Sequence, residues 1–396
     1  GDAHLYSQYD GRQITNVRVL GAHRTDEGLV ARILRLEPGS PFDSSRLAAG
    51  KRRLDALGAL DQVQMYVVPV GDNAVDIVVR ISEGFGLYLD PVQFVVENAL
   101  NLSQKTIALR YYNVAGTLAS IGGGYGFGPS RSRAAYLSFP VGSWPVSMRY
   151  QSHTTYTKVG WGAHEGSAYS LERKDASVSG SVPIGEHSAL GITLGYSQSN
   201  VQDITTTTGL TVPSGDYVTL ALTAQTGLPG TTTWTREGTS LQVGVAILAN
   251  RQDLNEKFAS WHMRARHLSY LGAGFVARAE VNGAWTTSGT PFDRRLRLGG
   301  GGQLGASSPL FVGEMYLHSN LELQRYFTHD LAAHVNYEVA KIWEDATHLA
   351  RSDLLHSVGG GLTYQTPIGV KIRAQYSKNL SLADTHSFSV GIVSSF

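Results

Sequence analysis

The chain has 396 residues, a length that two or three ordinary domains would fill, but its composition differs from theirs. Charged residues make up 16%, against about 25% in soluble globular domains, and 45 residues are glycine. A net charge of +1 gives no field that would attract nucleic acid, so no nucleic-acid partner is expected. The absence of cysteine excludes disulfide scaffolds, cysteine-ligated zinc and thiol nucleophiles. No apolar run is long enough to predict a membrane-spanning helix, and no leader segment opens the chain. This composition is compatible with a membrane β-barrel.

Residues 14–84 have the pattern of a small mixed domain, preceded by an N-terminal segment at 1–13. Ile14, Val17 and Val19 predict a short apolar strand that ends at Gly21. Two helices are expected next, the first capped by Thr25 and the second by Asp43, with a break at 38–41. Two alternating strands follow, joined by a turn at 71–73. The predicted order is strand-helix-helix-strand-strand.

Residues 85–396 change to a period of two. The stretch 187–198 is an example, because Leu190, Ile192 and Leu194 alternate with small or polar residues. A soluble sandwich would carry many charges on its polar face, whereas this polar face is mostly Gly, Ser, Thr and Gln. Apolar residues facing lipid and small polar residues facing a lumen are typical of transmembrane barrels.

Segments with this pattern number sixteen, an even count as bacterial outer-membrane barrels require. The predicted strands are 85–97, 105–112, 115–128, 131–141, 144–157, 167–183, 187–201, 216–226, 233–248, 258–270, 274–288, 310–326, 331–343, 354–366, 369–380 and 385–396. Tight turns alternate with longer links, so both ends of the barrel are expected on the short-turn side, with residues 1–84 in the periplasm. The predicted fold class is an α+β domain followed by an all-β, 16-stranded antiparallel transmembrane barrel.

Two stretches of the small domain, 36–43 and 54–63, resemble the POTRA family. A POTRA domain before a sixteen-stranded barrel resembles the outer-membrane insertase and translocase superfamily, which contains BamA, TamA and the two-partner-secretion transporters. Leu298-Gly299-Gly300 is similar to the start of that superfamily's inward-folded loop between strands eleven and twelve. The resemblance implies a lumen loop and a barrel wall that faces it. The lumen-loop candidates are Arg295, Arg297, Leu298, Gly299, Gly300, Gln303, Leu304 and Gly305, and the wall candidates are Glu322, Asn336 and Glu338.

The loop departs from the superfamily's pattern in one respect. The superfamily continues with Val-Arg-Gly, and its loop arginine pairs with an aspartate on the wall. Here Leu304-Gly305-Ala306-Ser307 lacks the arginine, and Asn336 stands where the aspartate would be. Losing both partners avoids an unpaired buried charge. Arg295, Arg297 or Glu338 are candidates for a substitute pair. The loop is also similar to the translocator of patatin-type autotransporters, although no Gly-x-Ser-x-Gly motif is present.

Signals for catalysis or cofactors are weak. Residues 300–305 match G-x-G-x-x-G, but no βαβ unit surrounds them, and a tightly turning loop explains the glycines better. No histidine pair has metal-ligand spacing beside a glutamate, and no carboxylate or Ser-His constellation is visible. We therefore expect no enzyme activity, no cofactor and no metal.

The expected mechanism starts at the edge of the POTRA sheet. Strand addition along Val63, Met65 and Val67 would capture an unfolded outer-membrane or secreted polypeptide. This client would cross the lumen, or enter the membrane lipid at a seam between the first and last strands. The seam candidates are Pro91, Gly391 and Phe396. A passive porin and an autotransporter translocator without its passenger are the alternatives, and the oligomeric state stays open.

Overall fold

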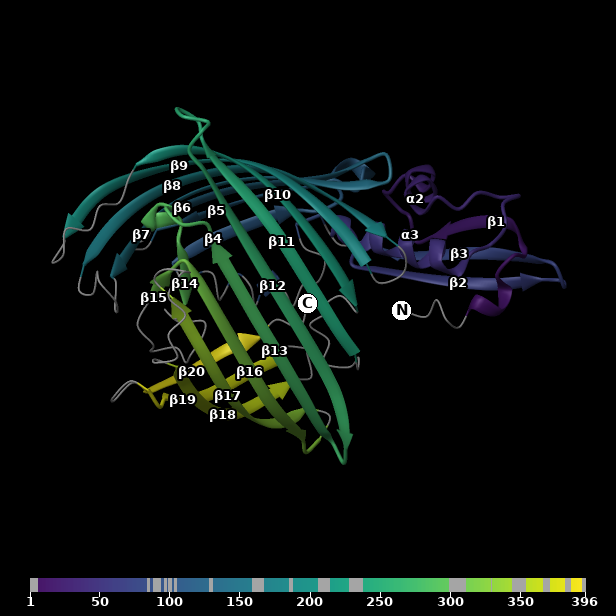
Figure 1. The fold of residues 1–396 in the computed structure, drawn as a ribbon. Coiled ribbons are helices and arrows are strands. Elements are labelled where there is room, and N and C mark those ends of the chain that lie inside the picture. The colour runs from purple at the N-terminus through teal and green to yellow at the C-terminus, as the bar shows by residue number, and fades with distance from the viewer. Residues whose placement is uncertain are drawn as a thin grey trace. The chain divides into compact units, whose positions relative to one another are not determined.

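The structure is a computed structural model of the full chain, drawn in Figure 1. It describes every residue except 1–5, 84–85, 88–93, 96–97, 99–101, 103–104, 128–130, 159–166, 185–187, 206–213, 228–237, 299–310, 329, 344–353, 366–370, 382–385 and 394–396. The chain divides into two compact units, one of residues 1–153 with 174–195 and one of residues 154–173 with 196–396. No helix among the described residues is both long and apolar enough to cross a membrane.

The N-terminal domain has the predicted order of elements. These are β1 (Gln13–Leu20), α2 (Glu27–Leu34), α3 (Ser44–Leu57), β2 (Gln62–Val70) and β3 (Ala74–Ser82). The sheet order is β1-β3-β2, with β1 parallel and β2 antiparallel to β3. Asp43 caps α3 as expected, accepting hydrogen bonds from the next two backbone N–H groups after Ser44. The cap of α2 is Asp26 rather than Thr25, and Thr25 makes a different contact that is described below.

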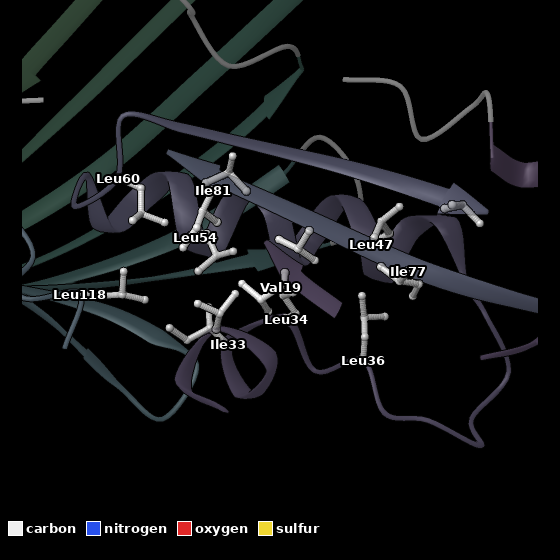
Figure 2. Close-up of a cluster of buried hydrophobic side chains, with 14 of the residues drawn as sticks. Val19, Ile33, Leu34, Leu36, Leu47, Leu54, Leu60, Ile77, Ile81 and Leu118 are labelled. Atoms are coloured by element: carbon white, nitrogen blue, oxygen red, sulfur yellow. The ribbon is translucent and has the colours of Figure 1, made fainter. Parts of the chain in front are cut away.

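The core of this domain lies between the sheet and the two helices. Val75, Ile77, Val79 and Ile81 alternate along β3 and are buried, so the period-two pattern of the sequence reports the core face of this strand. Figure 2 shows leucines of α3 and isoleucines of β3 pointing toward one another. Together with the helix residues they form one continuous apolar cluster.

One charge is buried beside this core. The guanidinium of Arg53 on α3 donates hydrogen bonds to the backbone oxygens of Ile33 at 2.7 Å and Leu34 at 2.8 Å. These oxygens belong to the last turn of α2, where carbonyls lack partners within the helix. Burial, together with the charges of Arg35 and Arg52, lowers the pKa of Arg53 to about 10, so it stays protonated at neutral pH and ties the helices together.

A large antiparallel sheet follows, and its fifteen described strands neighbour one another in chain order. The strands that lie wholly or partly in unit 1 are β4 (Thr106–Tyr111), β5 (Ser120–Gly126), β6 (Ser132–Val141), β7 (Trp144–Lys158), β8 (Ala168–Ile184) and β9 (Ser188–Thr205). The others are β10 (Gly215–Gly227), β11 (Gly238–Asn250), β12 (Lys257–Gly272), β13 (Phe275–Thr286), β16 (Met315–Tyr326), β17 (Leu331–Trp343), β18 (Leu355–Gln365), β19 (Lys371–Asn379) and β20 (His386–Val393).

The predicted first strand of the barrel is wrong at its described residues. Phe94, Val95 and Asn98 are helical, and the Asn98 side-chain amide donates to the Phe94 carbonyl at 2.7 Å. The stretch Val92–Val96 is a short apolar run, and such runs do not distinguish a strand from a helix. The other fifteen predicted strands overlap the fifteen described strands of the large sheet, but two of them begin too early. Residues 115–119 form the 3-10 turn η2 (Val114–Gly116) and the bend after it, and residues 311–313 form a separate short strand before β16.

Along these strands the large apolar side chains lie on an exposed face. Leu190, Ile192 and Leu194 of β9 are each about half exposed, and Leu220 and Leu222 of β10 repeat the pattern. A soluble sheet would bury this face and expose the other one. Exposure of alternate leucines, isoleucines and valines over many strands is typical of a surface that faces lipid.

A two-stranded sheet interrupts the chain between β13 and β16. It consists of β14 (Leu296–Leu298) and β15 (Phe311–Gly313), preceded by the 3-10 turn η3 (Phe292–Arg294). The strands pair antiparallel, with Leu298 opposite Phe311. We call β14 and β15 the loop stem, because they bracket residues 299–310, which lie outside the described part. The predicted lumen loop begins at this stem.

Candidate functional site

The first candidate site is the free side of β2 in the small domain. In the described chain β2 pairs only with β3, so it forms one edge of the sheet. The side chains of Val63 and Val67 are buried, because they belong to the core face of the strand. The exposed face of β2 instead carries Tyr66 and Val68, at 43% and 42% exposure. An added strand would therefore contact the backbone of β2 and these two side chains, not the valines expected from the sequence.

The opposite edge, β1, is already half covered. The segment that follows α2 pairs with its beginning, since Ile14 N–H donates to Ser40 O at 2.9 Å and Gly39 N–H donates to Ile14 O at 2.7 Å. Arg18, further along β1, reaches Asp76 at 3.3 Å. Of the two edges, β2 is thus the more accessible.

A second site joins the small domain to the hairpin turn between β4 and β5. The side chain of Leu118 in this turn is fully buried within the domain's core cluster, as Figure 2 shows. The Asn113 amide donates to the Thr25 hydroxyl at 2.8 Å, and Asp26 N–H donates to Gly116 O at 3.2 Å. The sequence pattern predicts a strand over 115–128, so the turn formed by residues 113–119 is not expected from it.

Glu83, just after β3, binds the backbone of the segment that contains Thr25. Its carboxylate accepts from Thr25 N–H at 2.8 Å and from Arg24 N–H at 3.1 Å. Burial alone would raise the pKa of Glu83, but the hydrogen bonds from Thr25 and Arg24 outweigh it and lower the pKa. The carboxylate is therefore charged at neutral pH and fixes the segment on which Asn113 docks.

The loop stem is the third site, and apolar packing holds it on two sides. Leu298 and Phe311 are buried against residues of β17 and β18. On the other side, Phe292 and Val312 pack with Tyr169 of β8, which is itself 1% exposed. Within unit 2, the stem thus contacts strands that are far apart in the sheet order. The inward-folded loop expected after Leu298 stays a prediction, because residues 299–310 lie outside the described part.

Charged groups around the stem form a set of short contacts. Arg295 pairs with Glu314 at 3.2 Å, and the side chain of Glu314 is 4% exposed. Arg297 donates to the Tyr169 hydroxyl at 2.9 Å. Asp293 accepts a hydrogen bond from Arg173 of β8 and forms an ion pair with Arg294 of η3. Arg295 and Arg297 therefore fix the loop stem, although neither contacts Glu338 in the described part of the chain.

The predicted wall residues form a separate cluster on the sheet. Glu322 pairs with Arg373 of β19 at 2.9 Å. The Asn336 amide donates to Glu338 at 3.4 Å, and Ser357 donates to the same carboxylate at 3.3 Å. The structure brings these wall residues together with one another, and the acid that pairs with a stem arginine is instead Glu314, between β15 and β16.

Glu314 escaped the sequence analysis although it lies only a few residues beyond the loop. An acid at the chain position where a loop returns to the sheet is the sequence signal that would have found it. Asp293 and its partner Arg173 lie 120 positions apart, so no spacing pattern connects them.

Several predicted positions lie outside the described residues, namely Gly299, Gly300, Gln303, Leu304, Gly305, Pro91 and Phe396. Gly391 lies in β20 opposite Arg373 of β19 and is exposed. In the described ranges, no group of three His, Asp or Glu side chains has the arrangement of a metal site.

Comparison with known proteins decides the nature of the small domain. Residues 13–84 match the family model "POTRA: Surface antigen variable number repeat". Residues 13–84 are a POTRA domain. The POTRA domain and the large antiparallel sheet together confirm the predicted fold class at the level of these two parts.

Solved structures share the fold of nearly the whole chain. BamA from Haemophilus ducreyi lacking POTRA domains 1–3 is 15% identical with a TM-score of 0.60, covering 96% of this chain and 83% of that one. CdiB from Acinetobacter baumannii is 13% identical with a TM-score of 0.63, covering 97% and 73%. CdiB from Escherichia coli is 14% identical with a TM-score of 0.63, covering 97% and 75%. No match was found among curated protein sequences.

Proposed function

We propose that this protein inserts polypeptides into the bacterial outer membrane or translocates them across it, with its POTRA domain in the periplasm. One observation supports the proposal above the others: a POTRA domain precedes a sheet whose alternate large apolar side chains are exposed. BamA and CdiB share this arrangement at the level of the fold. The client is an unfolded outer-membrane or secreted polypeptide, and the sheet contacts membrane lipid.

Client capture is assigned to the edge of β2. A sheet edge presents backbone N–H and C=O groups that can pair with any extended chain, so recognition does not depend on client sequence. The accessible edge, with Tyr66 and Val68 exposed beside it, supports this assignment. Pro69 lacks an N–H group and limits the pairing at the end of the strand.

Site-specific photo-crosslinking tests the capture step in the full-length protein in detergent. The probe is a peptide of this chain's own residues 386–396, HSFSVGIVSSF, which has the pattern of an outer-membrane strand. A photoreactive residue at Tyr66 is expected to crosslink the peptide. The matched control carries it at Arg80, which is also exposed but lies on the central strand β3.

A scrambled peptide should crosslink at Tyr66 about as well, whereas a peptide with alternate backbone N-methyl groups should not, because it cannot complete a ladder of hydrogen bonds. Equal crosslinking at Tyr66 and Arg80 would count against the edge. Survival of the Tyr66 crosslink after N-methylation would count against strand addition.

The transport step needs a separate test. Proteoliposomes that contain the protein should increase the membrane insertion, or the protease protection, of an unfolded outer-membrane β-barrel protein added from outside. Liposomes that contain a porin of similar size are the control. No increase over that control with any outer-membrane or secreted client would contradict the proposed function.

A further inference from the structure

A cavity of about 370 Å³ lies beside the loop stem, and four arginines line it. They are Arg173 of β8, Arg294 of η3, Arg295, and Arg297 of β14. Asp293 is the single carboxylate among the lining residues that the structure describes. We call these five residues the arginine pocket. All of them belong to unit 2.

The arginines are held in place before any ligand binds. The Asp293 carboxylate is fully buried and lies 3.3 Å from Arg173 and 3.2 Å from Arg294. Arg294 also donates to Ser197 at 2.9 Å, and its guanidinium lies 4.6 Å from the centre of the Tyr217 ring. Guanidiniums fixed in this way lose little freedom when they bind an anion, so binding is preorganised.

The positive charges outnumber the negative ones. Asp293 neutralises part of the charge of two arginines, and Glu314 pairs with Arg295 from outside the cavity lining. Arg297 donates to the uncharged Tyr169 hydroxyl, and within the described residues no carboxylate pairs with it. The described lining of the cavity therefore holds four guanidiniums and one carboxylate. Half-buried positive charge is costly unless an anion compensates it.

We propose that the arginine pocket binds a phosphate monoester. A phosphate monoester carries a charge of about −1.5 to −2 at neutral pH, so it offers the lining guanidiniums more negative charge than a single carboxylate does. Its three terminal oxygens accept hydrogen bonds from several directions, and guanidinium forks suit this geometry. This inference rests on the pocket alone and does not depend on the proposed transport function.

The remaining wall of the cavity indicates what the phosphate is attached to. Leu248 and Phe258 supply apolar surface, and Ser260 supplies a hydroxyl. The volume is more than ten times the roughly 30 Å³ of a water molecule in the liquid, so a phosphate leaves room for carbon atoms. A sugar phosphate fits these walls, either as a free molecule or as the headgroup of a lipid.

Calorimetric titration of the full-length protein in detergent tests the pocket, with glucose 1-phosphate as the probe and glucose as the uncharged control. Saturable binding of glucose 1-phosphate alone is expected. Arg297→Gln should weaken it about tenfold or more, because a hydrogen bond to a charged group is lost. Arg325→Gln is the matched control, since Arg325 of β16 lies over the Phe275 ring of β13 and does not line the cavity. Its affinity should equal that of the wild type.

Detergent micelles doped with phosphatidic acid identify the source of the phosphate. Tighter binding there than to glucose 1-phosphate assigns a lipid headgroup, and the reverse order assigns a soluble phosphate. If Arg297→Gln does not fold, Arg297→Lys replaces it as the test variant. It keeps the charge but loses the guanidinium fork, so an affinity between those expected for the wild type and for Arg297→Gln is expected. Absence of saturable binding to both phosphate probes, or equal affinity in Arg297→Gln and wild type, would overturn the proposal.

Discussion

The side-chain amide of Asn113 donates a hydrogen bond to the Thr25 hydroxyl at 2.8 Å. This bond joins the turn after β4 to the start of the first POTRA helix. The Asn113 carbonyl oxygen accepts from Leu118 N–H at 2.9 Å, which shapes the turn so that the Leu118 side chain enters the POTRA core. The core of this POTRA domain is therefore completed by a turn that lies beyond residue 84.

Replacing Gly116 tests this junction. A Cβ atom at Gly116 would lie 1.8 Å from the Arg24 carbonyl oxygen, and its φ of +76° disfavours any other residue. Gly116→Ala should therefore push the turn away from the POTRA domain. Because the chain has no cysteine, spin labels at Arg46→Cys and Arg149→Cys would be unique. Their distance distribution by double electron–electron resonance should broaden.

Gly142 provides the control for backbone strain. It also has a positive φ, +61°, but no atom would lie within 4 Å of its Cβ. Gly142→Ala should keep the narrow distribution of the wild type. Equal distributions in Gly116→Ala and wild type would show that the turn does not fix the domain.

Acid should weaken the same junction through Glu83. Its pKa is lowered in the folded protein, so its charge contributes stability above the unfolded value of about 4.5, and this contribution is lost as pH falls through the folded value. The urea midpoint of POTRA unfolding should therefore fall in the wild type as pH drops below about 4.5. In Glu83→Gln the midpoint should be lower at pH 7 and change less over that range. Parallel curves for the two proteins would contradict this role.

The strands of the large sheet could be predicted because each carries its own signal. Leu331–Trp343 has the same bounds in the sequence pattern and in the structure, since apolar and polar residues alternate through its middle, from Val335 to Val339. The stretch 85–97 has no such alternation. Phe94 and Val95 are helical there, and the periodicity of a short apolar segment does not distinguish a helix from a strand.

The candidate sites were harder to predict than the strands. The POTRA edge could be located, because the strand order follows from the family pattern, but the exposed face of β2 depends on register against β3. The arginine pocket depends on Arg173 and Asp293 meeting across 120 positions of sequence. Only folding of the loop stem against β8 brings such residues together, and a single sequence carries no signal for it.

The Arg295–Glu314 pair should show strong coupling. The Glu314 side chain is 4% exposed, so Glu314→Gln leaves the Arg295 charge without its carboxylate and should destabilise unit 2 by about 3 kcal/mol. The double variant Arg295→Met, Glu314→Leu removes both charges and should recover most of that loss. Unfolding in guanidinium chloride, followed by tryptophan fluorescence, measures the coupling. If the stability lost in the double variant equals the sum of the losses from the two single substitutions, the contact contributes little.

The loop stem should restrict ion flow, and Leu298 is the position that tests this. Leu298→Ala removes a fully buried side chain from the cluster with Phe311 and Ile342, which should weaken stem packing by about 2–5 kcal/mol. In planar bilayers the wild type is expected to show small, fluctuating conductance, and Leu298→Ala larger and longer openings. Leu317→Ala is the control, because Leu317 is 47% exposed on the outward face of β16 and should leave conductance unchanged. Large, steady channels in the wild type would instead favour a passive porin, because a stem packed on both sides should not leave a permanently open path.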